Sequence, residues 1–307
     1  MNRVLSKNEA DIPLNMTKKR SQLSSIWFRF RKNKLAMVGL VLLVIIIFFA
    51  VFAGVFADYE DDCVYQNMSE RLQLYAEGHL LGTDQYGRDL FARIIYGARI
   101  SLAICVSTVL VSMVIGSVLG AAAAYFGGIV DSIIMRIVDV FLAIPQMLMA
   151  VTIVSALGTS IFNLGVALMV SMIAPFSRIV RSAVLQVKGQ EYIEAAKAYG
   201  SKDIRIVFRH VLPNAIGPII VQTTLNMANT LLSVSGLGFI GLGIPAPMPE
   251  WGSMLAEAKS MMRFYPYLMI YPGLAIILTV LSFNLIGDGL RDALDPKFIT
   301  TNRPCAD

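Results

Sequence analysis

The sequence predicts an all-α integral membrane protein with six transmembrane helices and with both termini in the cytoplasm. Of the 307 residues, 56% are hydrophobic and 15% are charged, whereas soluble chains carry about 25% charged residues. Uncharged apolar runs recur that are long enough, at about 1.5 Å per residue, to cross a bilayer core of about 30 Å. The basic residues lie beside these runs, which is typical of cytoplasmic loops. A soluble domain is therefore excluded, and the net charge of +5 gives no reason to expect a nucleic-acid partner.

Residues 1–34 are predicted to form a basic cytoplasmic segment. They hold nine Lys or Arg residues, and Trp27, Phe28 and Phe30 are interleaved with arginines close to the first apolar run. Bulky aromatic rings beside cations favour the headgroup boundary, so this stretch is expected to form an interfacial helix. The first transmembrane helix is expected at 35–57. A nucleic-acid-binding arm has a similar composition, but the adjoining apolar run favours membrane contact.

Residues 58–99 are predicted to lie outside the cytoplasm. Eight acidic residues stand against four arginines here, which reverses the balance of the N-terminal segment. The second half of the segment has the pattern of a structured turn followed by an amphipathic helix that leads into the next apolar run.

Residues 100–297 are predicted to form a core with five further transmembrane helices, and residues 298–307 a cytoplasmic tail. The expected spans are 100–126, 131–157, 161–176, 214–237 and 267–286.

Three local patterns indicate how these spans are shaped. Gly116 and Gly120 have the spacing that lets two helices approach closely. Arg136 and Asp139 lie three residues apart on one face, which predicts an ion pair within the third span. Pro145 is expected to kink that span.

The cytoplasmic loop 177–213 carries a basic, amphipathic stretch. Residues 191–199 are predicted to form a short helix that ends at Gly200, because glycine adopts the left-handed conformation freely. Ser201 is expected to cap a second helix, which must stop before Pro213. A helix–glycine–helix elbow on a cytoplasmic loop indicates a docking surface and not a catalytic one.

The fifth span carries uncharged polar side chains at helical spacing. These positions are Gln222, Asn226, Asn229, Thr230 and Ser233. Such a stripe is either a contact between helices or the wall of a water-filled path, and both alternatives place it away from lipid.

The sequence lacks the motifs of common catalytic and nucleotide-binding sites. No G-x-x-x-x-G-K-[ST] occurs, so the chain is not expected to hydrolyse ATP itself, and neither G-x-S-x-G nor H-E-x-x-H is present. The three cysteines form no C-x-x-C pair. The two histidines, His79 and His210, are predicted to lie in an external loop and in the elbow. We therefore expect no enzyme activity, and no metal or cofactor bound by this chain.

The elbow matches a pattern found in permease subunits of bacterial ABC importers, E-A-A-x3-G-x9-I-x-L-P. Here EAA begins at Glu194, Gly200 follows after three residues, and after nine more the sequence HVLP ends at Pro213. The isoleucine position is the one departure, because His210 occupies it, and the role of this side chain is left open.

Four further blocks resemble the dipeptide/oligopeptide/nickel permease family, C-type subunit. They are HLLGTDQYGRDLFARIIYGARISL, MRIVDVFLAIPQ, LGFIGLGIPAPMPEWGSML and NLIGDGLRDALDPK. The resemblance implies the ABC importer type I permease fold in the bacterial cell membrane. It further implies a permease subunit of an ATP-driven importer, with di- or oligopeptides as the favoured solutes and nickel or glutathione-type solutes as alternatives.

The same resemblance implies partners and site residues. The partners would be a homologous B-type permease, two ATPase subunits that bind ATP and Mg²⁺, and an extracytoplasmic substrate-binding protein, which 81–88 and 244–251 are expected to meet. Exposed alanines and glutamates of the elbow would contact an ATPase. The expected coupling residues are Glu191, Glu194, Ala195, Ala196, Gly200, Leu212 and Pro213, and the polar stripe of the fifth span would line the translocation path.

Other classes of membrane protein fit the sequence less well. An ATP-independent secondary transporter normally places ionisable residues near the middle of the membrane, whereas these charges lie at the ends of the spans. A membrane-embedded enzyme would need catalytic groups that the sequence lacks. A purely structural scaffold would not need an elbow with this spacing.

Overall fold

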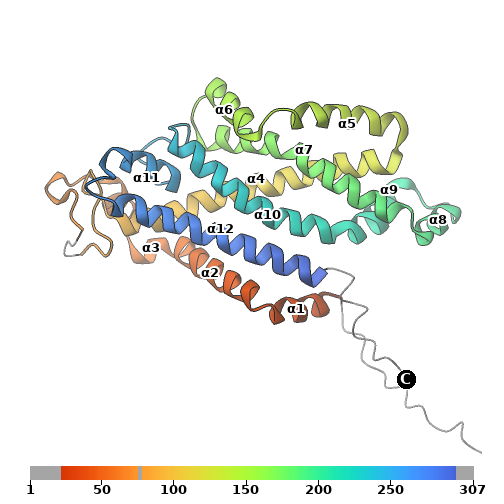
Figure 1. The fold of residues 1–307 in the computed structure, drawn as a ribbon, viewed down its shortest axis with the longest axis horizontal. Coiled ribbons are helices and arrows are strands. Elements are labelled where there is room, and N and C mark those ends of the chain that lie inside the picture. The colour runs from red at the N-terminus through yellow and green to blue at the C-terminus, as the bar shows by residue number, and fades with distance from the viewer. Residues whose placement is uncertain (1–21, 75–77, 295–307) are drawn as a thin grey trace, which may run out of the picture.

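The computed structural model describes residues 22–74 and 78–294, which form an elongated bundle of helices (Figure 1). The expected basic stretch before residue 22 and the expected tail at 298–307 lie outside the described residues. The helices are α1 (Gln22–Lys32), α2 (Lys34–Val51), α3 (Ala53–Phe56), η1 (Tyr59–Val64), η2 (Met68–Glu70), α4 (Leu90–Phe126), α5 (Gly128–Leu142), α6 (Gln146–Leu157), α7 (Ile161–Lys188), α8 (Glu191–Ala198), α9 (Asp203–Ile206), η3 (Val207–Val211), α10 (Leu212–Phe239), α11 (Trp251–Ala258), η4 (Lys259–Met261) and α12 (Tyr267–Leu294).

The bundle has two distinct ends. At the elbow end, α8 and α9 project from the bundle, and at the loop end lie the segments 58–74 and 78–89 together with α11 (Figure 1). The helix α1 lies beside the last turn of α12, toward the elbow end. Here the Arg29 guanidinium donates to the Ala293 carbonyl at 3.5 Å, and the Asn33 amide donates to the Asp292 carboxylate at 3.2 Å. The two described ends of the chain therefore meet, as an even number of crossings requires.

Five helical runs are long and apolar enough to cross a membrane. They are α2, α4, α7, α12 and the run Asp203–Phe239, which joins α9, η3 and α10. The predicted third span is instead two helices, α5 and α6, bent by 83°. The expectation of a single kinked helix is wrong because Pro145 has no N–H group and disfavours helical geometry at Ile144. Together α5 and α6 return the chain from the elbow end to the loop end (Figure 1), so the pair, counted as one broken span, brings the candidate crossings among the described residues to six.

The close contact predicted from Gly116 and Gly120 is confirmed and joins α4 to α7. A Cβ atom at Gly116 would lie 2.5 Å from the Phe176 Cβ, and one at Gly120 would lie 2.4 Å from the Ser177 carbonyl oxygen. No side chain fits at these distances, so the two glycines set the separation of the two helices.

The predicted helices on both sides of the first span are also confirmed. Asn33 separates α1 from α2, and its side chain accepts hydrogen bonds from the Leu35 and Ala36 N–H groups. On α1, Phe30 is buried, whereas Trp27 and Phe28 are exposed. The location of this helix at the membrane interface stays a prediction. At the loop end, Asp89 caps the first turn of α4 by accepting from the Ala92 N–H group, so this helix begins ten residues before the predicted apolar span.

Candidate functional site

The predicted elbow is present at the junction of α7, α8 and α9. Gly200 has φ +73°, its N–H group donates to the Lys197 carbonyl at 2.9 Å, and the Ser201 N–H group donates to the Ala196 carbonyl at 3.2 Å. These two bonds and the left-handed glycine form a Schellman motif that closes α8. The backbone of Ser201 is thus used to end α8. The expectation that Ser201 caps the next helix is wrong, because Lys202 occupies the N-cap position of α9.

The second helix of the elbow does not stop before Pro213. It continues through the π-helical turn η3 into α10, and Pro213 lies in the first turn of α10. A proline is tolerated there because the first turn does not need its missing N–H group. The side-chain amide of Asn214 donates to the His210 carbonyl at 2.6 Å and so satisfies a backbone oxygen at the junction. The elbow and α10 therefore form one continuous helical run.

The elbow packs on a set of buried apolar side chains, here called the elbow cluster. Its members are Ala121, Ala124, Tyr125, Val180, Ala183, Val184, Ile193, Ile206, Val207, Val211, Ala215 and Ile219. Ile193 is fully buried and is the one buried residue of α8.

The predicted coupling residues divide into two groups on this scaffold. Glu191, Glu194, Ala195, Gly200 and Pro213 are exposed. Ala196 and Leu212 are half-buried and pack against the elbow cluster. The predicted flat face of two exposed alanines is therefore reduced to one alanine, because Ala196 lies three residues after Ile193 on the buried face of α8.

The elbow also exposes large apolar side chains, and the sequence pattern alone does not mark them as functional. Tyr192, Tyr199, Ile204 and Phe208 are all exposed, and they come from α8, from the turn and from the helical run that follows. Exposed apolar side chains at this density are typical of a surface that another protein covers.

The polar stripe of α10 runs from an exposed edge to a buried edge. At about 100° per residue, the order around the helix is Asn229, Gln222, Ser233, Asn226 and Thr230. Asn229 is exposed, whereas Asn226 is 5% exposed and Thr230 is fully buried.

Hydrogen bonds connect the members of this stripe. The Gln222 amide donates to the Asn226 side-chain oxygen at 3.0 Å, and the Thr230 hydroxyl donates to the Asn226 carbonyl at 2.7 Å and lies 3.0 Å from the Met172 sulfur on α7. The buried edge is therefore a contact between helices. That the exposed edge lines a path stays a prediction.

A charged cleft of about 430 Å³ lies between α5 and α7, and its lining includes Ser132, Met135 and Arg136. Arg181 donates two hydrogen bonds to Asp131, each of 2.6 Å, and Arg178 pairs with Asp139. The predicted Arg136–Asp139 pair is wrong. Asp139 pairs across the cleft because Arg178 and Arg181, three residues apart on α7, face the two aspartates of α5.

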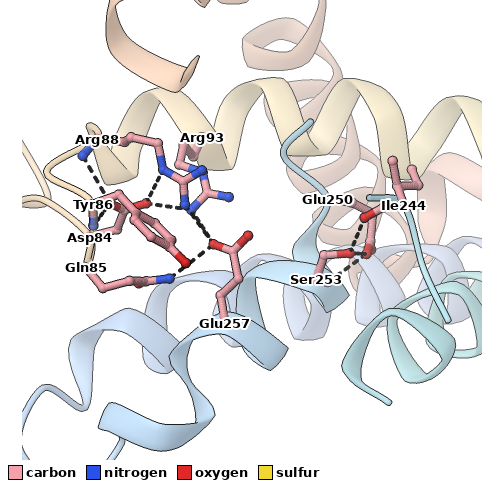
Figure 2. A network of polar contacts seen from close by, with 9 residues as sticks. All are labelled: Asp84, Gln85, Tyr86, Arg88, Arg93, Ile244, Glu250, Ser253 and Glu257. Atoms are coloured by element: carbon pink, nitrogen blue, oxygen red, sulfur yellow. Dashed lines mark hydrogen bonds and ion pairs between the residues drawn. The ribbon is translucent and has the colours of Figure 1, made fainter. Parts of the chain in front are cut away.

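At the loop end, a network of ion pairs fixes the 78–89 loop to α4 and α11 (Figure 2). Asp84 accepts from the Arg88 Nε at 2.7 Å and from the Arg93 Nη1 at 2.6 Å. Glu257 accepts from the same two guanidinium groups, at 2.8 and 2.9 Å, and from the Gln85 amide at 3.2 Å. Two arginines and two carboxylates balance each other in charge in a largely buried site, and within the described residues the Arg93 Nε has no hydrogen-bond partner.

A buried glutamate holds the first turn of α11 beside this network (Figure 2). Glu250 is fully buried and accepts from the N–H groups of Gly252 and Ser253, both at 2.8 Å, and from the Ser253 hydroxyl at 3.0 Å. Burial raises the pKa of Glu250, and these hydrogen bonds oppose the rise. The Trp251 indole donates to the Ile94 carbonyl at 3.0 Å. The two segments that were predicted to meet a binding protein, 81–88 and 244–251, are thus both anchored to α4.

The two histidines lie in the elbow and in the loop end, where the sequence predicts them. The His79 Nδ1 lies 2.6 Å from an oxygen of Asp89, and its Nε2 lies 3.5 Å from Glu70. Among the residues that the structure describes, no three His, Cys, Asp or Glu side chains are grouped to hold a metal ion.

Comparisons with known proteins match most of the chain. Residues 113–300 match the model of the family described as "binding-protein-dependent transport system inner membrane component", and residues 21–74 match the model of the "N-terminal TM domain of oligopeptide transport permease C". The dipeptide transport system permease protein DppC of Alkalihalophilus pseudofirmus is 45% identical over 88% of this chain and 88% of the relative.

Two other relatives are named for different solutes. The oligopeptide transport system permease protein OppC of Bacillus subtilis is 40% identical over 89% of this chain and 90% of the relative. The glutathione transport system permease protein GsiD of Pectobacterium atrosepticum is 42% identical over 91% of this chain and 92% of the relative.

Among solved structures, a chain of the inward-facing methionine ABC transporter MetNI aligns with a TM-score of 0.54 at 21% identity, over 66% of this chain and 96% of that chain. The fold is therefore that of an ABC importer permease.

Proposed function

Because this chain belongs to the family of binding-protein-dependent transport system inner membrane components, we propose that it is the permease subunit of an ATP-driven importer of di- and oligopeptides. It is a multi-pass protein of the bacterial cell membrane and a membrane component of a transporter, not a catalyst. Membership of the family implies another permease, an ATPase and a binding protein as partners. We infer a homologous B-type permease and two ATPase subunits, with ATP and Mg²⁺ held by those subunits.

The observation that carries the proposal is the exposed elbow, with its E-A-A and glycine spacing. On α8, Glu191, Glu194 and Ala195 face outward, while Ile193 alone is buried. This helix offers hydrogen-bond acceptors and a small side chain to a partner. Its opposite face is attached to the elbow cluster through Ile193. We assign the outward residues to contact with the ATPase, and Ala196 and Leu212 to attachment of the elbow. The elbow end then faces the cytoplasm.

One continuous helical run connects the elbow to the polar stripe. The run Asp203–Phe239 is 37 residues long and includes the polar stripe of α10. A helix of this length extends over about 55 Å, so a displacement at its elbow end tilts the stripe as well. We propose that Gln222, Asn229 and Ser233 face the translocated solute and that Asn226 and Thr230 support them from the side of α7. ATP-driven movement of the elbow thereby opens and closes the path in alternation.

Peptides are the favoured solutes because a dipeptide permease matches at 45% identity and an oligopeptide permease at 40%. Glutathione is the second candidate, since a glutathione permease matches at 42% identity. Nickel complexes are the third candidate.

The coupling assignment is tested by the Glu194→Lys variant in the whole transporter, reconstituted with its partner subunits and binding protein in liposomes. We expect peptide uptake driven by ATP to fall at least tenfold, because the new cation replaces an acceptor at the contact with the ATPase. The matched control is Glu60→Lys, which reverses an exposed glutamate at the loop end. Wild-type uptake by Glu194→Lys would refute the coupling role of α8, and uptake without any ATPase would support a secondary transporter.

A further inference from the structure

The last turn of α4 lies directly behind the elbow and ends in Tyr125. This side chain is 4% exposed and belongs to the elbow cluster, where it packs with residues of α7, α8 and η3. Its hydroxyl group donates to the Asp203 carboxylate at 2.5 Å, and Asp203 is the first residue of α9. A bond between a hydroxyl group and a carboxylate is strong, and it gives a direct link between the end of α4 and the second helix of the elbow.

Two lysines add contacts with the same tyrosine. The Lys197 ammonium group, from the last turn of α8, lies 5.0 Å from the centre of the Tyr125 ring, and that of Lys188, at the end of α7, lies 5.9 Å from it. Lys188 also donates to the Ala124 carbonyl at 3.1 Å. Both distances are within the range of a cation–π interaction. Tyr125 thus contacts a residue from each of the three helices that form the elbow.

The remaining attachments of α8 are few. Ile193 is its one buried residue, and no atom outside the neighbouring residues lies within 4 Å of a Cβ placed at Gly189 or Gly200, the glycines on either side of it. A force applied to α8 therefore reaches the bundle through Ile193 and the half-buried Ala196, through Lys197 at the ring of Tyr125, and through the chain to Asp203.

The chain makes a turn directly after the end of α4, at two glycines with positive φ angles. Gly127 and Gly128 have φ +67° and +54°, and a Cβ at Gly128 would meet nothing within 4 Å. This turn begins α5, which lines the charged cleft with Asp131 and Asp139. A small movement of the α4 terminus can therefore change the direction of α5 without a steric clash at Gly128.

We propose that Tyr125 is a positioning residue that transmits movement of the elbow to the α4–α5 turn, in parallel with the direct connection from the elbow to α10. The hydrogen bond to Asp203 and the contact with Lys197 make α4 follow α8 and α9 as one body. The direct connection moves α10, and the connection through Tyr125 moves α5. This proposal rests on the proposed docking of α8 to an ATPase.

The test is the Tyr125→Phe variant in the reconstituted transporter, with uptake and ATP hydrolysis measured in the same vesicles. The ring remains to fill the elbow cluster, and the hydroxyl group alone is lost. We expect the number of peptides taken up per ATP hydrolysed to fall about fivefold or more, while ATP hydrolysis continues. A purely structural role would lower the amount of assembled transporter but would leave this ratio unchanged.

Two further variants show whether the hydroxyl group acts through Asp203. Asp203→Asn keeps an oxygen acceptor, so its number of peptides taken up per ATP hydrolysed should be higher than that of Asp203→Ala. If the two side chains act through one bond, the double variant Tyr125→Phe with Asp203→Ala should be no worse than Asp203→Ala alone. The matched control is Tyr65→Phe, which removes the hydroxyl group of an exposed tyrosine at the loop end.

A wild-type ratio in Tyr125→Phe would overturn the inference, as would additive losses in the double variant. The result is separable from a failure of the proposed function. If Glu194→Lys abolishes coupled uptake and Tyr125→Phe does not, the transmission role alone is wrong. If neither variant changes the ratio, the coupling role of the elbow is wrong as well.

Discussion

At the scale of single residues, one glycine shapes the turn of the elbow, and one isoleucine sets the orientation of α8. Gly200 supplies the left-handed C′ position of a Schellman motif, which a residue with a side chain would adopt at a cost of about 1 kcal/mol. Ile193 fixes which face of α8 is buried, and this decides that Ala195 is exposed and that Ala196 is not. The pattern E-A-A therefore contains one surface alanine and one packing alanine.

Protonation of His79 is expected to stabilise the contact between the 78–89 loop and the start of α4. Partial burial lowers the pKa of His79, but its interactions with Asp89 and Glu70 outweigh this and raise the pKa above its usual value. A cation that gains partners on folding contributes stability that is fully present below pH 6.5 and is lost as the pH rises through the higher folded-state value. Thermal unfolding at pH 6 and pH 8.5 should thus show a higher Tm at pH 6.

The His79→Gln variant should make this Tm difference smaller, because the neutral amide does not titrate. An unchanged difference in that variant would mean that other groups, and not His79, give the pH dependence.

At the scale of elements, two kinds of contact hold the bundle together: close helix packing and a network of ion pairs. In the middle, α4 and α7 approach closely because Gly116 and Gly120 leave no side chain between them. At the loop end, α4, α11 and the 78–89 loop are joined by charges, with Arg93 and Asp84 each almost fully buried. Removal of one partner from a buried ion pair is costly because the other charge stays behind without compensation.

Glu257→Ala is expected to destabilise the protein by about 3 kcal/mol, since it leaves Arg88 and Arg93 with Asp84 as their one carboxylate partner in the network. The loss should appear as a lower Tm and as faster hydrogen exchange in α11. Glu60→Ala, at an exposed position of η1, is the control and should have no measurable effect. Equal Tm values for the two variants would show that the network contributes nothing to the attachment of α11.

Much of the architecture could be predicted from local sequence patterns. Apolar run length indicated the spans, the glycine spacing indicated a close-packing face on α4, and Gly200 indicated the turn of the elbow, because each depends on residues close together in the chain. That α7 is the helix packed on the two glycines is known from the structure alone. The ion pairs could not be predicted in the same way. Arg93 meets Glu257 across 164 residues, and Asp139 meets Arg178 across 39, so the local pairing of Asp139 with Arg136 was the wrong expectation.

The bend between α5 and α6 is also sharper than the sequence indicates. A proline predicts a bend in a helix, but the 83° angle depends on what the two helices pack against. Likewise, the polar stripe of α10 is visible in the sequence, whereas its division into a buried edge and an exposed edge follows from the position of α7 beside Thr230.

At the scale of the whole molecule, the chain is a bundle whose two ends carry different chemistry. The elbow end presents a small helix with exposed glutamates and aromatic rings, and the loop end presents loops fixed by ion pairs. The run Asp203–Phe239 connects the elbow to the polar stripe, and α4 connects it to the loop end, since Tyr125 and Arg93 lie on the same helix. In the proposed transporter, this continuity allows a cytoplasmic ATPase to change the far end of the path.

The most direct test of this account is photo-crosslinking from α8 in the assembled transporter in its native membrane. A photoreactive amino acid at Ala195, which is exposed on α8, should capture an ATPase subunit, and the yield should change when ATP is bound. The same amino acid at Leu80, exposed at the loop end, should capture no ATPase subunit. Capture of the ATPase from Ala195 alone is the predicted result. Capture of lipid alone from Ala195, in a transporter that still takes up peptide, would contradict the account.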